Sequence, residues 1–145
     1  MLAYVCLVAL FTFAAVESKV FSRCELAKEL VRVGVPRSDV HHWVCMAQYE
    51  SSLNTAAQSP PNSDNSRDHG LFQINDYWNC DNGNGRTKNG CNKRCSVFRD
   101  DNLTDDVACI KQLKREHGNT YNFSYAYRDN CLGQVTTSFL GTCSY

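Results

Sequence analysis

Residues 54–75 read NTAAQSPPNSDNSRDHGLFQIN, and they decide the fold because two kinds of sequence meet in them. Residues 54–67 are rich in the turn-forming residues Asn, Ser, Pro and Asp, whereas DHGLFQIN (68–75) has the composition of a short segment in a small sheet. The sequence on both sides favours helices. We therefore predict an α+β fold, in which a helical lobe lies beside a small, irregular, sheet-containing lobe with a ligand cleft between them.

Helical patterns flank this segment on both sides. The first predicted helix begins at a capping box, in which Ser22 is followed three residues later by Glu25. A second helix is expected from about residue 38 to about residue 53, where apolar residues recur at helical spacing. The third is predicted over Thr104–Glu116, before a glycine that ends it.

The first eighteen residues differ from the rest of the chain. MLAYVCLVALFTFAAV is an apolar run followed by VES, which is typical of a secretory signal cleaved between Ser18 and Lys19. A membrane anchor is the alternative, but the run is short for a span and no positive cluster flanks it. We predict a signal peptide at 1–18 and a single secreted, extracellular domain at 19–145.

The charge of this domain excludes some classes of partner. Residues 19–145 contain all 15 basic residues and 14 of the 15 acidic ones, so their formal charge is close to neutral. This balance indicates neither a nucleic-acid-binding surface nor a membrane-binding one. We expect a monomer that binds no nucleic acid and no membrane.

The cysteines predict four disulfides. Cys6 belongs to the predicted signal, which leaves eight of the nine cysteines in the domain, and an even number in a small secreted chain is typical of a disulfide framework. Sequence alone allows 105 pairings of eight cysteines. Zinc binding by CNKRC (91–95) is the alternative, but the chain offers no Cys-x-x-Cys and no matching His pair.

Glu50 is the first candidate for chemistry. On the second predicted helix it lies at the edge of the apolar stripe, beside Trp43, Met46 and Ala47. Partial burial raises the pKa of a carboxyl, and a raised pKa suits a general acid near neutral pH. The alternative is a boundary glutamate that reaches solvent.

Asp68 is the second candidate, because it opens DHGLFQIN in polar surroundings where an aspartate stays ionised. The following Gly70 allows a close approach of backbone. One protonated and one ionised carboxyl across a cleft can hydrolyse a glycosidic bond. A simple turn aspartate is the alternative, since the spacing from Glu50 alone does not bring the two together.

The neighbourhood of Asp68 offers groups that bind sugars. Aromatic faces combined with planar amides suit carbohydrate, and QINDYW (73–78) supplies both. Trp78 is expected to be a sugar platform, with a core position as the alternative. The predicted substrate-binding residues are Asn62, Gln73, Asn75 and Trp78.

Several longer motifs carry a family resemblance. KVFSRCELAKEL (19–30), WVCMAQYESSLNT (43–55), SRDHGLFQIND (66–76) and CNKRC (91–95) together resemble the c-type lysozymes, and the likeness spans residues 19–145. The order of the cysteines, the Glu of YESS and the Asp of DHGLFQIN all match the family pattern.

The resemblance implies a fold and an activity. It implies a helical lobe packed on a small three-stranded antiparallel lobe, with the active-site cleft between them. It also implies a bacteriolytic, antimicrobial enzyme that hydrolyses the β-1,4 linkages between N-acetylmuramic acid and N-acetylglucosamine in peptidoglycan, or cleaves chito-oligosaccharides, with retention. Glu50 would be the general acid and Asp68 the nucleophile or charge stabiliser. The implied disulfides are Cys24–Cys143, Cys45–Cys131, Cys80–Cys95 and Cys91–Cys109.

Two positions depart from the family pattern. Asn79 stands where the family has the second of two adjacent aromatic residues. Ser124 stands where the family has a tryptophan that walls the catalytic glutamate, and Phe123 or Tyr125 is expected to fill that space instead. With nothing there, Glu50 would be better hydrated and its pKa less raised, so we expect activity that is reduced or displaced toward acidic pH.

The sequence DDNLTDD (100–106) poses a separate question, because four neighbouring aspartates repel one another. It does not match an EF-hand, since Asp105 replaces the glycine and Lys111 the closing glutamate of that motif. Asp105 and Asp106 have an explanation without metal, because acids are favoured in the first turn of a helix for which Thr104 is a suitable N-cap.

The same segment resembles the calcium loop of α-lactalbumins and calcium-binding lysozymes. This resemblance implies a structural Ca²⁺, while catalysis would need no cofactor. The implied ligands are the carboxylates of Asp100, Asp105 and Asp106 and the backbone carbonyls of Val97 and Asn102.

The α-lactalbumins supply a competing interpretation from another functional class. They share the fold, bind calcium and modify a galactosyltransferase without glycosidase activity. Non-catalytic relatives usually lack the acid at the position of Glu50, and both candidate carboxylates are present here. The sequence therefore favours an enzyme, with a calcium-binding, non-catalytic or weakly catalytic sugar-binding protein as the alternative.

Overall fold

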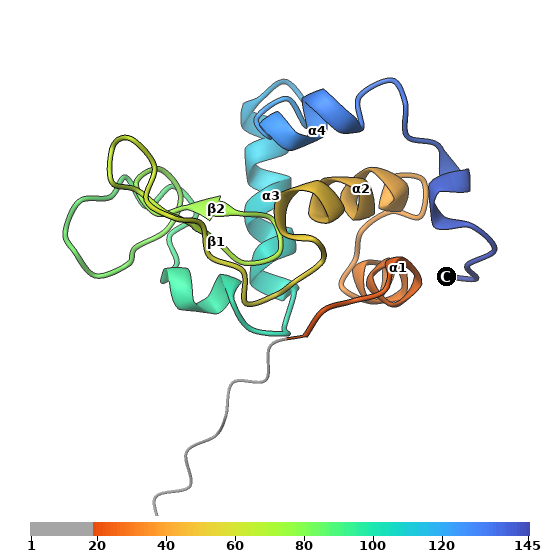
Figure 1. Ribbon diagram of the computed structural model, residues 1–145, viewed down its shortest axis with the longest axis horizontal. Helices are drawn as coiled ribbons and strands as arrows, with labels where there is room; N and C mark the ends of the chain where they lie inside the picture. The colour runs from red at the N-terminus through yellow and green to blue at the C-terminus, as the bar shows by residue number, and fades with distance from the viewer. Residues whose placement is uncertain (1–18) are drawn as a thin grey trace, which may run out of the picture.

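The computed structural model describes residues 19–145, so the predicted signal peptide lies outside the described residues. Figure 1 shows helices α1, α2 and α4 on one side of the upright helix α3, and the two short strands with their long loops on the other. The elements in chain order are α1 (Arg23–Arg32), α2 (Val40–Ser51), β1 (Asp68–His69), β2 (Ile74–Asn75), η1 (Cys95–Phe98), α3 (Thr104–Glu116), α4 (Tyr125–Asn130) and η2 (Thr137–Leu140). None of the helices described is both long enough and apolar enough to cross a membrane.

Local sequence signals account for most of the helices. The capping box of α1 forms as predicted, with Ser22 Oγ accepting from Glu25 N and the Glu25 side chain accepting from Ser22 N. Helix α3 has the predicted bounds, Thr104–Glu116. Thr104 was expected as its N-cap, but it is the first helical residue, and its N–H and hydroxyl both donate to Asn102 Oδ1. The Asx turn at Asn102 takes the capping role because its side chain already faces the helix start.

The sheet is smaller than the resemblance implies. Strands β1 and β2 pair antiparallel, with Asp68 opposite Asn75 and His69 opposite Ile74. The third strand is reduced to one bridge between Gln58 and His69. Two prolines follow at 60–61, and because proline has no N–H to donate, the pairing cannot continue past them.

A glycine seats the β1–β2 turn against η1. Gly70 has φ +76°, and a Cβ at this position would lie 1.5 Å from the carbonyl oxygen of Phe98. The close backbone approach predicted at Gly70 is therefore present, and its partner is the end of η1. This contact fixes the distance between the hairpin and η1, the segment that precedes residues 100–106.

The helical lobe is closed by an aromatic and polar cluster. The Trp43 ring is buried edge-on against Phe72, with centroids 5.6 Å apart, and its Nε1 donates to Tyr121 Oη at 2.8 Å. Tyr121 in turn donates to Asp39 Oδ2, which also forms a 2.7 Å ion pair with Lys114. Burial raises the pKa of Tyr121 to about 12, so this hydroxyl remains a donor across the physiological range.

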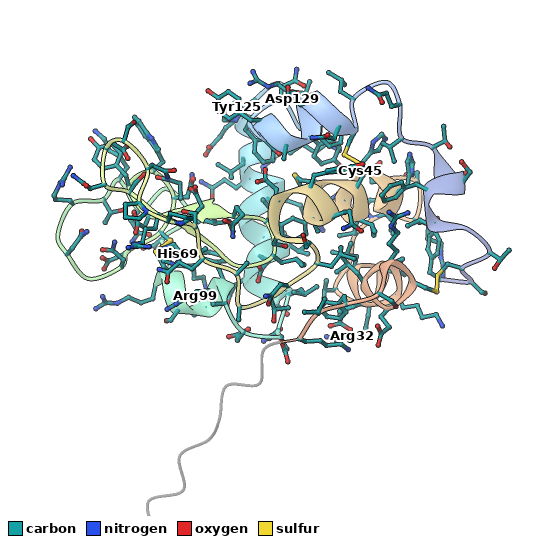
Figure 2. The ribbon with its side chains drawn as sticks, viewed as in Figure 1. Arg32, Cys45, His69, Arg99, Tyr125 and Asp129 are labelled. Carbon is teal, nitrogen blue, oxygen red and sulfur yellow. A yellow bond between two sulfur atoms is a disulfide. The ribbon has the colours of Figure 1, made fainter. Side chains whose placement is uncertain are left out.

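Four disulfides cross-link the domain, and disulfides are the yellow bonds in Figure 2. Cys91–Cys109 joins the hairpin lobe to α3, and the other three lie within a lobe. Cys91 and Cys95 of CNKRC bond to different partners, which rules out the alternative in which that motif chelates zinc. The pairs are those that the family resemblance implies: Cys24–Cys143, Cys45–Cys131, Cys80–Cys95 and Cys91–Cys109.

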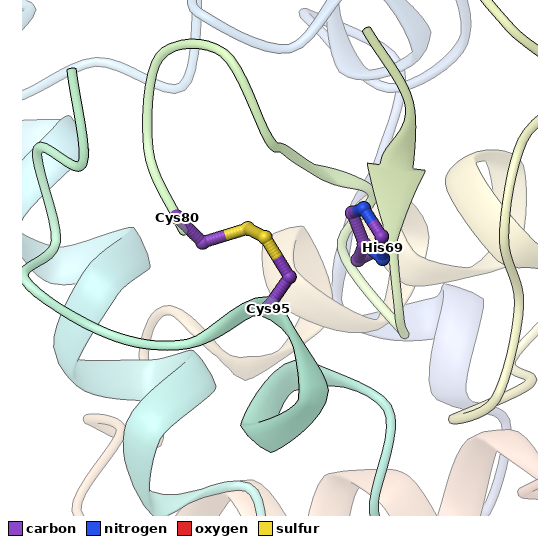
Figure 3. Close-up of side chains that lie close together, drawn as sticks. All are labelled: His69, Cys80 and Cys95. Carbon is purple, nitrogen blue, oxygen red and sulfur yellow. A yellow bond between two sulfur atoms is a disulfide. The ribbon is translucent and has the colours of Figure 1, made fainter. Parts of the chain in front are cut away.

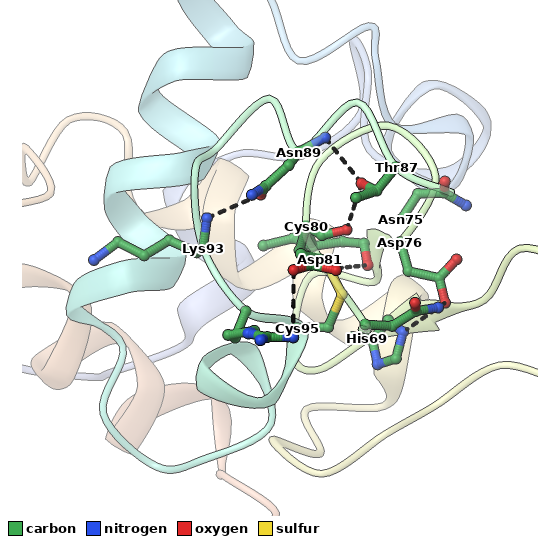
Figure 4. The surroundings of a disulfide bond; sticks show 12 residues. His69, Asn75, Asp76, Cys80, Asp81, Thr87, Asn89, Lys93 and Cys95 are labelled. Atoms are coloured by element: carbon green, nitrogen blue, oxygen red, sulfur yellow. Dashed lines mark hydrogen bonds and ion pairs between the residues drawn. A yellow bond between two sulfur atoms is a disulfide. The ribbon is translucent and has the colours of Figure 1, made fainter. Parts of the chain in front are cut away.

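His69 lies close to one of these bridges. Figure 3 shows the ring beside the sulfurs of Cys80 and Cys95, and the three potential ligand atoms lie within 4.8 Å of one another. Because the two sulfurs are bonded to each other, they offer no thiolates to a metal. His69 instead contacts Asp76 through Nε2 at 3.2 Å, as Figure 4 shows.

Candidate active-site cleft

A cleft of about 840 Å³ runs between the helical lobe and the hairpin lobe. Both candidate carboxylates, Glu50 and Asp68, line it. The four predicted sugar-binding residues line it as well: Asn62, Gln73, Asn75 and Trp78. The fold therefore gathers into one groove every residue for which the sequence predicted a role in sugar chemistry.

Glu50 lies in the last turn of α2, where the helix meets the hairpin. The next residue, Ser51, donates its hydroxyl to Leu71 O at 2.8 Å and thereby ties the end of α2 to the β1–β2 turn. Ser52 and Leu53 then adopt positive φ and turn the chain away from the helix. These contacts fix the position of Glu50 relative to β1, the strand that carries Asp68.

The surroundings of Glu50 favour its protonated form. Burial raises the pKa of the Glu50 carboxyl above its ordinary value; the hydrogen bond from Ser124 acts against this rise, and the negative charge of Asp68 adds to it. Ser124 Oγ lies 2.5 Å from Glu50 Oε1. A carboxyl that stays protonated at higher pH than usual is suited to donate a proton.

Phe123 and Tyr125, which were expected beside Glu50, line the same cleft. Phe123 packs near the His117 ring with centroids 5.6 Å apart, and Tyr125 is 73% exposed at the start of α4, where Figure 2 labels it. Ser124 itself takes the position, because its hydroxyl caps α4 by accepting from Tyr127 N at 3.0 Å and is only 6% exposed. Glu50 therefore meets a polar donor where a bulky ring was expected.

Asp68 is held in the opposite way, by amides. Asn75 Nδ2 donates to Asp68 Oδ1 at 2.8 Å, and Asn62 Nδ2 donates to Oδ2 at 3.1 Å. Both amides also donate to Ser66 Oγ. An amide donor on each oxygen holds the Asp68 carboxyl in place in the cleft wall, which suits a nucleophile or a charge stabiliser.

His69 does not tune Asp68, because neighbouring residues of a strand point to opposite faces. It faces Asp76, which is buried. Although burial acts to raise the pKa of Asp76, hydrogen bonds from Arg67 N, His69 and Asn82 lower it. The pair is a buried structural contact under the hairpin.

The remaining predicted sugar ligands have distinct positions. Trp78 is 57% exposed in the cleft wall, so the core alternative for this residue is wrong. Asn75 Oδ1 accepts from the backbone N–H groups of Tyr77 and Trp78, so the side chain that holds Asp68 also places the tryptophan. Gln73 Nε2 donates to Gly70 O within the turn. Asn79 also lines the cleft.

The segment 97–106 lies apart from the cleft and contains an unpartnered buried acid. Asp106 is 1% exposed, and neither of its carboxylate oxygens has a hydrogen-bond partner among the described residues. Burial raises the pKa of Asp106 well above its ordinary value, and the charges of Asp100 and Asp105 add to the rise. Such an orphaned carboxylate is costly unless it is protonated or meets a cation.

The donor set around Asp106 fits a hard divalent cation. Asp105 is held by Lys93 at 2.8 Å, and Asp100 Oδ1 accepts from Asn102 N. Carboxylate and carbonyl oxygens are the ligands that Ca²⁺ prefers, and the segment offers both kinds. Asp101 is exposed, and its Oδ1 accepts from Thr55 Oγ1 at 2.7 Å.

Sequence reasoning missed two contributors to the site. Ser124 was treated as a missing ring, although a serine just before YAYRDN is an N-cap signal that predicts an inward hydroxyl. Ser66 was not considered, although it accepts from both amides that hold Asp68. The contact between Ser124 and Glu50 joins residues from separate segments, and Ser66 contacts Asn62 in its own loop as well as Asn75 in β2.

Comparisons with known proteins agree with this arrangement. The model of the C-type lysozyme/alpha-lactalbumin family matches residues 19–143. Lysozyme C, milk isozyme, of Canis lupus familiaris is 39% identical and covers 87% of this chain and 99% of its own length. Lysozyme 1 of Musca domestica is 37% identical, with 94% and 98% covered. The crystal structure of lysozyme from Equus asinus superposes with a TM-score of 0.79 at 36% identity, covering 88% of this chain and 100% of that one.

Proposed function

The chain belongs to the C-type lysozyme/alpha-lactalbumin family, and from that premise we propose that it is a secreted, bacteriolytic glycoside hydrolase. Its substrate is peptidoglycan, which it cleaves at the β-1,4 linkage between N-acetylmuramic acid and N-acetylglucosamine with retention. Relatives named lysozyme support the glycosidase class, and the chemistry of the cleft supports the finer assignment. Chito-oligosaccharides, which share the linkage, are the simpler substrates of the same site.

One observation carries the proposal. Glu50 and Asp68 line the same cleft in opposite environments, one partly buried with a raised pKa and the other held by two amide donors. Two carboxyls in such different surroundings suit the general acid and the nucleophile or charge stabiliser of retaining glycoside hydrolysis, for which lysozyme is the type case. A non-catalytic relative has no need of both.

The chemistry follows from these two environments. Glu50 gives its proton to the glycosidic oxygen as the bond to the anomeric carbon breaks, and Asp68 forms a bond to that carbon or stabilises its positive charge. The deprotonated Glu50 then takes a proton from water, whose oxygen attacks the anomeric carbon. This attack breaks any bond from that carbon to Asp68, releases the Asp68 carboxylate and restores the original configuration. Trp78 offers its exposed face to a sugar ring beside the reacting bond.

Clearance of a peptidoglycan suspension by the purified domain tests this function. The wild-type protein is expected to clear it, and the Glu50→Gln variant is expected to lose that activity while keeping its folded spectrum. Nuclear magnetic resonance of the first product formed from a chito-oligosaccharide reports its anomeric configuration. Clearance by Glu50→Gln at the wild-type rate would remove Glu50 from the mechanism and favour a non-enzymatic sugar-binding role.

We also propose a structural Ca²⁺ at residues 97–106, because Asp106 is buried without a partner. The carboxylates of Asp100, Asp105 and Asp106 and the carbonyls of Val97 and Asn102 would hold it. The ion would neutralise the clustered acids and fix the start of α3, and it has no part in catalysis. Calorimetric titration of chelator-treated protein with Ca²⁺ tests this, with Asp106→Asn as the control that should give no heat.

A further inference from the structure

Ser124 makes two hydrogen bonds that together fix the direction of its hydroxyl. Its oxygen accepts from Tyr127 N at 3.0 Å, and it lies 2.5 Å from Glu50 Oε1. Ser124 is only 6% exposed, and among residues 19–145 the one hydrogen bond in which its hydroxyl is the donor goes to Glu50 Oε1. The proton of Ser124 therefore points at Glu50, because any other direction would leave a buried donor without a partner.

This direction determines which oxygen of Glu50 carries the acidic proton. Oε1 accepts from Ser124, so a proton on Oε1 would meet the serine proton head-on. The acidic proton therefore lies on Oε2. We propose that Ser124 is a positioning residue that holds Glu50 through Oε1 and assigns the transferable proton to Oε2, an inference that rests on the proposed hydrolase function.

The same contact changes in strength during the reaction. When Oε2 gives its proton to the glycosidic oxygen, the carbon–oxygen bond breaks and Glu50 becomes a carboxylate. A hydrogen bond to an ionised acceptor is about twice as strong as one to a neutral acceptor. Ser124 therefore stabilises the charge that forms on Glu50 in the transition state, which is where a hydrogen bond accelerates a reaction.

The charged groups around Glu50 do not stabilise its negative charge. Asp68 faces Glu50 from β1 and raises its pKa, and the acids Asp64 and Glu116 line the same cleft, with His117 beside Glu116. None of the described cleft-lining residues is a lysine or an arginine. Ser124 is the donor that the structure places on the Glu50 carboxylate.

Four variants separate the two roles of the hydroxyl. Ser124→Ala removes both the cap and the donor, whereas Ser124→Gly removes the donor but keeps an acceptable N-cap residue. Ser124→Thr keeps a hydroxyl for both contacts. Ser22→Ala is the matched control, because Ser22 caps α1 through the same kind of hydrogen bond and does not line the cleft.

The pH dependence of kcat/KM on a chito-oligosaccharide is the activity readout. Ser124→Ala and Ser124→Gly are expected to move the alkaline limb to higher pH, because ionised Glu50 loses its donor, and to lower the plateau kcat roughly tenfold. Ser124→Thr should keep the wild-type profile. Ser22→Ala should lower the Tm but leave the alkaline limb in place. If Ser124 had a purely structural role, its variants would give this same result.

A titration of the Glu50 carboxyl carbon by nuclear magnetic resonance needs no turnover. Its midpoint should rise in Ser124→Ala and Ser124→Gly and stay in place in Ser124→Thr and Ser22→Ala. An unchanged midpoint in folded Ser124→Gly overturns the inference, whatever the activity. If the midpoint rises in the Ser124 variants but the wild-type protein cleaves no glycan, the role of Ser124 toward Glu50 is supported and the proposed hydrolase function is refuted.

Discussion

Glu50 and Asp106 are both acids that burial makes harder to ionise, yet their surroundings differ. Glu50 opens onto the cleft and has a hydroxyl donor on one oxygen. Asp106 is enclosed, its neighbours are other acids, and both of its oxygens lack partners among the described residues. Burial with one donor and one open side produces an acid that can release a proton to a ligand. Burial among acids with no donor produces a site that calls for a cation.

Replacing Glu50 is expected to have the largest effect. Glu50→Gln keeps the shape of the side chain and its contact with Ser124 but has no proton to transfer. Loss of a general acid should lower the rate of peptidoglycan clearance by about a hundredfold to ten-thousandfold. Asp106→Asn should keep most of the wild-type rate. If the two variants lost activity equally, the distinction between a reacting acid and a structural acid would be wrong.

Gly70→Ala tests the contact between the hairpin and η1, the segment that precedes residues 100–106 and therefore Asp106. The added Cβ would lie 1.5 Å from Phe98 O, so we expect destabilisation of about 3 kcal/mol in urea denaturation. Gly85→Ala is the control, because its φ is also positive but nothing lies within 4 Å of the added atom. It should cost about 1 kcal/mol, from backbone strain alone. If Gly70→Ala and Gly85→Ala lowered the free energy of unfolding equally, the hairpin would have moved away from η1 without a measurable loss of stability.

Asp106→Asn tests whether the buried carboxyl of Asp106 makes the stability of the protein depend on pH. The pKa of Asp106 is raised in the folded state, so the folded protein is favoured while this carboxyl is protonated and loses stability as pH rises from the unfolded value of 3.8 through the folded pKa. In chelator at neutral pH, Asp106→Asn should therefore be more stable than wild type by about 1 kcal/mol. Thermal unfolding between pH 4 and pH 8 measures this.

Adding Ca²⁺ should reverse that order, because the cation stabilises the wild-type carboxylate and finds a weaker ligand in asparagine. Wild-type Tm should then rise with Ca²⁺ concentration while that of the variant stays in place. A variant that is less stable than wild type in chelator at pH 7 would show that Asp106 has a partner of its own.

Trp78→Ala is expected to leave the stability almost unchanged and to affect substrate affinity instead. Covering about 50 Å² of the exposed ring with a sugar contributes about 1.3 kcal/mol, so KM for a chito-oligosaccharide should rise about tenfold. Because Trp78 is more than half exposed, the Tm should barely change. An unchanged KM would remove this ring from the binding surface.

Patterns within single segments were predicted well from sequence. The capping box at Ser22 and Glu25 and the bounds of α3 depend on residues three or four apart, and such short-range chemistry is visible in the sequence. The disulfide pairs could be expected only from the family resemblance, because eight cysteines alone leave their partners open. Even a local signal can be misread, as at Thr104, where Asn102 is the better-placed acceptor.

The site was predicted in composition but not in its contacts. The two carboxylates and the exposed tryptophan lie in one cleft, whereas the hydrogen bond from Ser124 to Glu50 joins residues 74 apart in sequence. No periodicity or motif reports such a contact. The predicted sugar ligands Asn62 and Asn75 also hold Asp68, a role that depends on the register of the hairpin and so becomes visible only in three dimensions.

The bridge between Cys45 and Cys131 has a mechanical consequence for the acid. Helix α2 carries both Cys45 and Glu50, and α4 runs from Ser124 at its N-cap to Cys131 at its C-cap. The two helices are therefore joined at both ends of α4, covalently at one and by the Ser124–Glu50 hydrogen bond at the other. Glu50 and Ser124 are thus held together by two links, so we expect the pair to keep its geometry when a ligand binds in the cleft.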